Sequence, residues 1–149
     1  MEEKEIIVTI KDRHTQDGDS ESSELITTGV FVGVDGDFSI SYNEQNAELE
    51  SCVTTLKVQG DKKVTMMRTG RYTAEMIMEK NKRHNCHYAT PFGSFMMGVY
   101  AKDIESAVSE DGTKGKLLLK YTIDFNSSNA MENELDIRFE EVKRNVTVG

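Results

Sequence analysis

Apolar and polar residues alternate along most of the chain with a period of two residues. The pattern is clearest in the last third, where Leu119, Tyr121 and Ile123 alternate with Lys120 and Thr122. A period of two is typical of a β-strand that buries one face and exposes the other. The sequence lacks the 3.6-residue period of an amphipathic helix of about ten or more residues. The chain is therefore predicted to be nearly all β.

Runs of this pattern, separated by turn residues, predict about ten short strands. We expect the strands at residues 6–11, 25–34, 38–42, 49–59, 64–69, 72–79, 86–90, 94–102, 116–125 and 135–140. Residues 12–23 are polar and acidic and are predicted to form a loop, and residues 80–84 a charged loop. The sequence Asp35-Gly36-Asp37 is typical of a hairpin turn. A single helical turn is expected within 103–109, and residues 126–133 are expected to connect the last two strands.

Short strands at regular spacing suit either a β-sandwich or an antiparallel barrel. We favour a barrel because nearly every strand has one apolar and one polar face, and because closure removes exposed sheet edges. The sequence thus predicts an all-β, antiparallel, mostly up-and-down β-barrel of about 8–10 strands. A single domain is expected over residues 1–149, with a core at about 5–142 and a frayed tail at 143–149.

The only proline, Pro91, lies between two expected strands and predicts a fixed corner. Proline lacks an N–H group and fixes its own φ, so it is excluded from the middle of a central strand. It also holds Thr90 in an extended conformation. Gly93 can adopt backbone angles that are closed to other residues. Between these residues, Phe92 is expected to anchor the corner in the core.

Four short motifs carry a resemblance to a known family. They are Tyr42-x-Glu44, Arg68-x-Gly70, Tyr88-x-Thr90-Pro91-Phe92-Gly93 and Leu119-x-Tyr121, of which the third is the most specific. On these motifs the chain resembles the YwiB-like family of small bacterial proteins, from about residue 6 to residue 141. The resemblance implies a calycin-like (lipocalin-like) β-barrel. It implies no activity, because the family has no established one, and ligand binding by such barrels is only a fold-level analogy.

The formal charge of −8 limits the binding partners that we expect for the protein. An acidic chain without a basic stripe disfavours nucleic acid and the anionic surface of a membrane. The first residues lack the apolar segment of a secretory signal, and no window approaches the ~20 apolar residues of a membrane span. We therefore expect a cytoplasmic location. There Cys52 and Cys86 would be free thiols, although two strands could also bring them together as a disulfide.

Glu44 and Arg68 are the first candidates for chemistry inside the barrel. Glu44 shares its parity with Phe38 and Tyr42, and Arg68 shares its parity with Met66. If these faces point inward, the two charges lie together near one end. In one interpretation Arg68 grips a carboxylate or phosphate of a bound molecule. In the other, which we favour, the two form an ion pair that plugs the closed end, because buried charges are normally paired.

The methionines are the second candidates, since six of the eight lie at positions 66, 67, 76, 78, 96 and 97. Met66, Met76, Met78 and Met96 are expected to share the inward face. Methionine adapts to apolar ligands of varied shape. The alternative is an ordinary core with methionine as filler, because a barrel of this size is either just filled or just hollow.

The motif His84-x-Cys86-His87 has the composition of a metal site but the wrong geometry. On a strand, residues 84 and 86 face one way and residue 87 the other, which leaves too few ligands for zinc. No metal or cofactor is expected. For the same reason His87 cannot serve Cys86 as a base, although Cys52 with His84 stays open.

The acidic residues of the expected first loop lack the central glycine and distal glutamate of a calcium loop, so they are interpreted as a solvated charge run. They are Asp12, Asp17, Asp19, Glu21 and Glu24. Phosphate-binding glycine loops, Gly-x-Ser-x-Gly and zinc-protease motifs are also missing from the sequence, which argues against the common enzymes.

The favoured function is a non-catalytic barrel that binds a small apolar or anionic ligand. One alternative is a filled barrel that serves as a structural or protein-interaction module. The less favoured alternative is an enzyme that uses Glu44 as acid or base beside Arg68. The candidate ligand-binding residues are Tyr42, Glu44, Met66, Arg68, Met78, Tyr88 and Met96.

Overall fold

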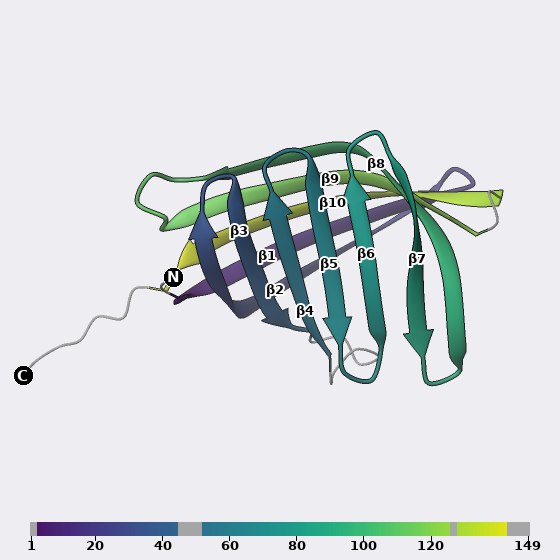
Figure 1. Cartoon of the computed structure of the whole chain (residues 1–149), viewed down its shortest axis with the longest axis horizontal. Coiled ribbons are helices and arrows are strands. Elements are labelled where there is room, and N and C mark those ends of the chain that lie inside the picture. Colours follow the sequence, from purple (N-terminus) through teal and green to yellow (C-terminus); the bar gives the residue numbers. More distant parts are fainter. Residues whose placement is uncertain (1–2, 45–51, 126–127, 143–149) are drawn as a thin grey trace, which may run out of the picture.

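The computed structural model describes residues 3–44, 52–125 and 128–142, which form ten antiparallel strands closed into a barrel (Figure 1). Each strand pairs with its neighbours in the sequence, and β1 pairs with β10 to close the ring. The predicted all-β, antiparallel, up-and-down barrel is confirmed. The strands are β1 (Glu3–Gln16), β2 (Asp19–Val34), β3 (Asp37–Asn43), β4 (Val53–Gln59), β5 (Lys63–Thr69), β6 (Thr73–Glu79), β7 (Arg83–Thr90), β8 (Gly93–Val108), β9 (Lys114–Phe125) and β10 (Ser128–Glu141).

Two walls of different strand length make up the barrel. Strands β3 to β7 have 7 or 8 residues, whereas β1, β2, β8, β9 and β10 have 12 to 16. Figure 1 shows the short strands side by side in front of the long ones. No described residue belongs to a helix long and apolar enough to cross a membrane.

The acidic loop predicted at residues 12–23 is wrong, because β1 and β2 continue through it as a hairpin. The turn is only Asp17 and Gly18, with φ angles of 52° and 82°. Beside it, the hydroxyl oxygens of Thr15 and Ser20 lie 2.8 Å apart in a cross-strand hydrogen bond. The end of this hairpin is exposed on both faces. Strand pairing there needs no apolar alternation, so the sequence pattern disappears while the strands persist.

The helical turn predicted within 103–109 is also wrong, because β8 runs on to Val108. A β-bulge shifts the register between Ala101 and Asp103. The bulge moves the inward position from Ala101 to Ile104, both of which are about 1% exposed. This reset breaks the period of two and produces the three-residue spacing that imitates a helix.

Two expected loops are shorter than predicted. Strand β7 starts at Arg83, within the charged loop expected at 80–84, and β10 starts at Ser128, within the connection expected at 126–133. The hairpin turn at Asp35-Gly36 is confirmed between β2 and β3. The frayed tail expected at 143–149 and the expected start of the fourth strand at 49–51 lie outside the described residues.

One end of the barrel is closed by packed aromatic rings and by hydrogen bonds between neighbouring turns. The rings of Phe31 and Phe139 stack with centroids 4.8 Å apart, and Phe38 packs against both. The backbone N–H of Ser106 donates to Asp61 Oδ1 at 2.8 Å. Three further bonds connect turns at this end: Gly60 N to Gly36 O (2.8 Å), Val108 N to Asp35 Oδ1 (3.0 Å) and Lys80 N to Lys62 O (2.8 Å).

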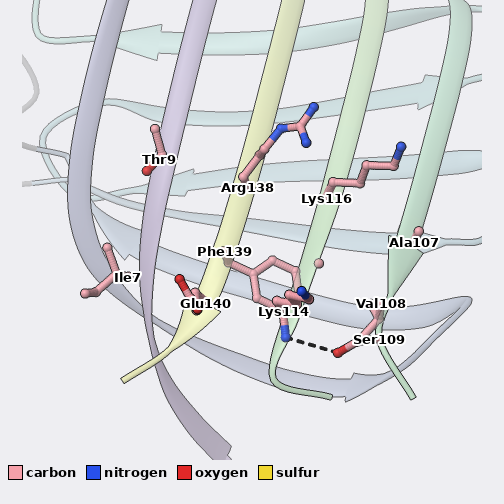
Figure 2. Close-up of a pocket in the computed structure, with 11 residues that line it drawn as sticks. Ile7, Thr9, Ala107, Val108, Ser109, Lys114, Lys116, Arg138, Phe139 and Glu140 are labelled. Carbon is pink, nitrogen blue, oxygen red and sulfur yellow. Dashed lines mark hydrogen bonds between the residues drawn. The ribbon is translucent and has the colours of Figure 1, made fainter. Parts of the chain in front are cut away.

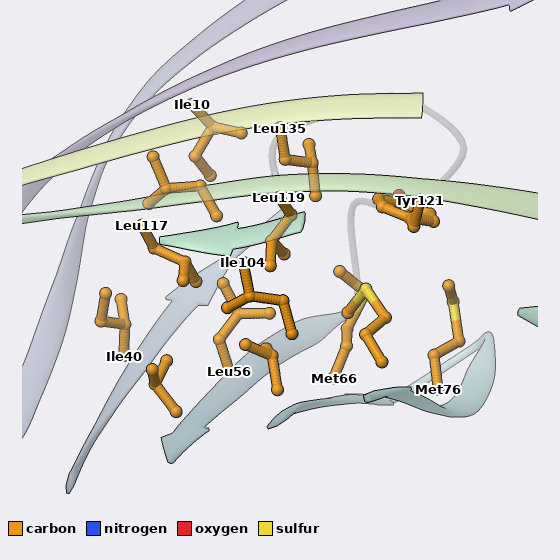
Figure 3. Close-up of a cluster of buried hydrophobic side chains, with 14 of the residues drawn as sticks. Ile10, Ile40, Leu56, Met66, Met76, Ile104, Leu117, Leu119, Tyr121 and Leu135 are labelled. Atoms are coloured by element: carbon orange, nitrogen blue, oxygen red, sulfur yellow. The ribbon is translucent and has the colours of Figure 1, made fainter. Parts of the chain in front are cut away.

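The composition of the core changes along the barrel. Figure 3 shows Ile40 and Leu117 on one side of the buried cluster and Met66, Met76 and Tyr121 on the other. The first side leads to the closed aromatic end. The second side leads to the end where β3, β5 and β9 finish, and there the described residues leave a hollow.

The corner at Thr90-Pro91-Phe92-Gly93 is confirmed as the turn between β7 and β8, but the predicted burial of Phe92 is wrong. Thr90 Oγ1 accepts from Phe92 N at 3.1 Å and donates to Gly93 O at 3.0 Å. Gly93 has a φ of 144°, in the region that favours glycine. Phe92 is 86% exposed, because a two-residue turn at the tip of a hairpin has no core beneath it.

Candidate functional site

A cavity of about 610 Å³ lies at the end of the barrel opposite the phenylalanine cluster. We call it the mouth pocket. It is lined by inward-facing residues from both walls. Its polar and aromatic lining includes Asp12, Tyr42, Glu44, Arg68, Tyr88, Tyr121 and Phe125, and its apolar lining includes Ile10, Leu25, Met66, Met76, Met97, Ile123, Met131 and Leu135.

Five of the seven residues expected to line an interior site lie on the wall of the mouth pocket: Tyr42, Glu44, Met66, Arg68 and Tyr88. They face inward because they share the parity of the buried residues on each strand: Phe38 and Ile40 on β3, Val64 on β5 and Cys86 on β7. Whether these residues contact a ligand stays a prediction.

Met78 and Met96 do not line the mouth pocket. Met78 is fully buried in the core, deeper in the barrel. The expected inward position of Met96 is wrong, since it is 56% exposed on the outer face. Residues opposite each other in an antiparallel pair share a face, and the β7–β8 turn sets Met97, not Met96, opposite inward-facing Cys86. Met97 therefore takes the place in the pocket that was predicted for Met96.

Glu44 and Arg68 meet as predicted, and Thr54 joins them. The Thr54 hydroxyl donates to Glu44 Oε1 at 2.7 Å, and Arg68 Nη2 donates to the same oxygen at 3.4 Å. The Glu44 and Arg68 side chains are only 10% and 18% exposed. The pair lies at the open end, so the interpretation that it plugs the closed end is wrong in its location. Arg68 is neutralised within the protein and presents no unpaired positive charge to the pocket.

The same contacts bear on Glu44 as an acid or base. Its Oε1 already accepts two hydrogen bonds, and the side chain is largely shielded from solvent. A general base must reach the proton that it removes, and a carboxylate paired with Arg68 and shielded from solvent is poorly placed to do so. This geometry counts against a catalytic role for Glu44.

Two buried tyrosines extend the polar part of the pocket wall. Burial raises the pKa of Tyr42 well above its usual value, and the nearby Glu44 carboxylate raises it further. Burial likewise raises the pKa of Tyr121, with an added effect from Asp12. Both side chains are therefore neutral phenols at physiological pH, able to donate or accept a hydrogen bond. At the rim, Tyr88 stacks on Tyr72 with centroids 6.3 Å apart.

Asp12 is one of the pocket residues that the sequence pattern did not identify, along with Tyr121 and Phe125. It was assigned to a solvated loop, but it lies on β1 and lines the mouth pocket. Its Oδ1 lies 3.4 Å from His14 Nδ1, yet this buried oxygen accepts no hydrogen bond from the residues that the structure describes. Burial raises the pKa of Asp12, His14 lowers it and Glu44 raises it. The alternation of Ile6, Val8 and Ile10, carried on by one step, would have identified this position.

The thiols of Cys52 and Cys86 accept hydrogen bonds from the backbone, and His84 contacts Glu79. Ile77 N donates to Cys86 Sγ at 3.4 Å, and Tyr72 N donates to Cys52 Sγ at 3.3 Å. Both thiols are free and buried. His84 Nε2 lies 2.9 Å from Glu79 Oε1. The described part of the chain holds no group of three or more residues that could bind a metal ion.

A second hollow, of about 690 Å³, lies on the outer face of β1, β8, β9 and β10 (Figure 2). It is lined by outward side chains such as Lys116 and Arg138, and the Arg138 guanidinium donates to Asp136 Oδ1 at 2.9 Å. The inward ring of Phe139 reaches it because Gly115 carries no side chain: a Cβ there would collide with Phe139 Cζ. These charged side chains lie on the outer face, whereas the mouth pocket lies between the two walls of the barrel, so the mouth pocket is the better candidate site.

Fold and site together define a class of protein: a closed ten-stranded antiparallel barrel, packed at one end and hollow at the other. Residues 8–137 match the family described as a domain of unknown function (DUF1934), and the chain belongs to this family. The crystal structure of YwiB from Bacillus subtilis is similar over 95% of this chain and 94% of that chain, with a TM-score of 0.81 and 23% identity. The resemblance to the YwiB-like family is thus confirmed. A comparison with curated proteins gives no match.

Proposed function

We propose that the protein is a non-catalytic barrel that binds one small, partly apolar molecule in the mouth pocket. The observation that carries this proposal is a cavity of about 610 Å³ inside the open end. Pockets for small molecules run from roughly 300 to 1,000 Å³ and combine apolar walls with a few placed polar groups. The mouth pocket has this size and this composition.

The walls suit a ligand with an apolar body. Met66, Met76 and Met97 are 6–7% exposed and supply flexible, polarisable surface. Tyr42 and Tyr121 add flat rings with a hydroxyl group at one edge. The alternative of a filled barrel requires an interior without a cavity above about 100 Å³, well below the size of useful ligand pockets. The mouth pocket exceeds that limit.

Two adjacent methionines provide a matched test. Met66 points into the mouth pocket and is 6% exposed, whereas Met67 points outward and is 40% exposed. Met66→Trp therefore fills the pocket, while Met67→Trp adds the same bulk outside the barrel. Both variants and the wild type are purified gently from the native host and examined by native mass spectrometry, with thermal unfolding as a check on the fold.

We expect a stoichiometric extra mass on the wild type and on Met67→Trp, lost on denaturation, and its absence on folded Met66→Trp. A clean apo mass on the wild type counts against the proposal. An extra mass that persists on Met66→Trp refutes the mouth pocket as the binding site.

A further inference from the structure

We infer that the ligand of the mouth pocket carries a cationic amine, held by the carboxylate of Asp12 while its apolar body lies against the methionine and tyrosine wall. This inference rests on the proposed function and adds the chemical class of the ligand.

The charges of the pocket point to a cation. Two inward carboxylates, those of Asp12 and Glu44, and one guanidinium, that of Arg68, belong to its lining, which leaves a formal charge of −1; Glu24 borders the pocket from the outer face of β2, where it lies opposite Lys11. Arg68 is paired with Glu44, and this pairing compensates its charge and weakens its attraction for an anionic ligand. The chain as a whole carries a formal charge of −8, which attracts cations and repels anions at a distance.

Asp12 supplies the specific acceptor. Its Oδ1 is buried, with His14 Nδ1 3.4 Å away, but the Asp12 side chain as a whole is 32% exposed, so the other oxygen, Oδ2, is the one that a ligand in the pocket can reach. An ammonium group offers three N–H donors and a positive charge. It can satisfy Asp12 and direct its other donors to neighbouring oxygens. A metal ion would need several such ligands together, and no such group occurs among the described residues.

The groups around Asp12 favour an amine attached to an apolar body. Tyr121 is close enough to Asp12 for the two to interact electrostatically, and both line the pocket with Tyr42. Tyrosine rings attract ammonium groups through their π-electrons. Met66 and Met76 line the pocket from β5 and β6, on the wall opposite Asp12 and Tyr121. The pocket thus has an anionic, aromatic part and an apolar part, in the arrangement that an amphipathic monoamine requires.

Three probes of one shape and different charge test the inference by isothermal titration calorimetry. They are 2-phenylethylamine (cationic), 2-phenylethanol (neutral) and 3-phenylpropionate (anionic). We expect the wild type to bind the amine about 10-fold or more tightly than the alcohol, the ratio that one charge-assisted hydrogen bond provides. The propionate should bind more weakly than the alcohol. Added salt should weaken binding of the amine and leave binding of the alcohol unchanged.

Asp12→Asn keeps the shape of the side chain and removes its charge, so the preference for the amine should fall to near 1. Glu134→Gln is the matched control, because Glu134 is an exposed residue on the outer face of β10 and its loss changes the net charge by the same amount. This control should retain the wild-type preference. Thermal unfolding checks that both variants are folded, and the comparison of probes on the wild type needs no variant.

The inference is overturned if the wild type binds the three probes equally, if it prefers the propionate, or if Asp12→Asn keeps the preference for the amine. In these cases the proposed function stands, provided that Met66→Trp abolishes the binding. If none of the probes binds, the inference is again overturned, and the native mass spectra decide separately whether the proposed function falls with it.

Discussion

Replacing Arg68 by methionine should destabilise the barrel by removing the cation that faces Glu44. At 3.4 Å, two unit charges attract by about 5 kcal/mol at an effective dielectric constant of about 20. Desolvation of both groups offsets most of this attraction. Glu44 also keeps the 2.7 Å hydrogen bond from Thr54. We expect the free energy of unfolding to fall by about 2 kcal/mol, which is typical of a lost hydrogen bond between charged groups. The Tm should fall by about 4–8 °C.

Urea denaturation at pH 7 of Arg68→Met, Glu44→Gln and the double variant forms a double-mutant cycle. We expect a coupling of at least about 1 kcal/mol, because residues in contact within one network are not additive. Lys102→Met is the matched control: its ion pair with Glu132 is shorter, at 2.8 Å, but both side chains are about half exposed or more. The Lys102 variant should lose less than about 0.5 kcal/mol. Equal losses for Arg68→Met and Lys102→Met, or no coupling in the cycle, would refute the reasoning that burial makes this pair matter.

Three further outcomes follow from single contacts. Gly115→Ala should lower the free energy of unfolding by about 1–3 kcal/mol, as expected for an overpacked core, because the new Cβ collides with Phe139. In urea denaturation, Phe139→Leu in the same chain should recover part of this loss. If it recovers none, the collision is excluded as the cause. Cys86 should react with iodoacetamide more slowly in the folded than in the unfolded protein at pH 8, since burial raises its thiol pKa; equal rates by mass spectrometry would contradict this. Hydrogen bonds from Ser109 and Thr113 lower the pKa of Asp111 from 3.8 to about 2. The ionised Asp111 carboxylate therefore stabilises the folded state above pH 3.8, and this contribution should be lost as the pH falls through about 2. An NMR titration midpoint near the usual value would refute that shift.

The inward faces of single strands could be predicted from the sequence, because one buried face imposes its own period. Phe38, Ile40, Tyr42 and Glu44 are all buried as expected, although Glu44 is charged, since the pattern depends on position rather than on polarity. The meeting of Glu44 with Arg68 followed from the same parity on two strands.

The failures have a different origin. The face of Met96 depends on the register across the β7–β8 hairpin, which the turn sets and a single-strand pattern does not contain. Asp12 was missed because its inward position is occupied by a charged residue at the start of a polar run, so the hydrophobic pattern ends at Ile10 although the alternation of burial continues. The bulge after Ala101 had a similar effect on β8, where a local backbone adjustment reset the period.

The pairing of β1 with β10 has a consequence for folding during synthesis on the ribosome. Ile6 lies opposite Glu141, so the ring cannot close until nearly all of the described chain has left the ribosome. Until then β1 has an unpaired edge, which is a template for pairing with another nascent chain. Contacts of such long sequence separation are slow to form, typically in milliseconds to seconds for all-β proteins. A chain cut short before Ile137 would expose two sheet edges at once and should aggregate rather than fold into a smaller barrel.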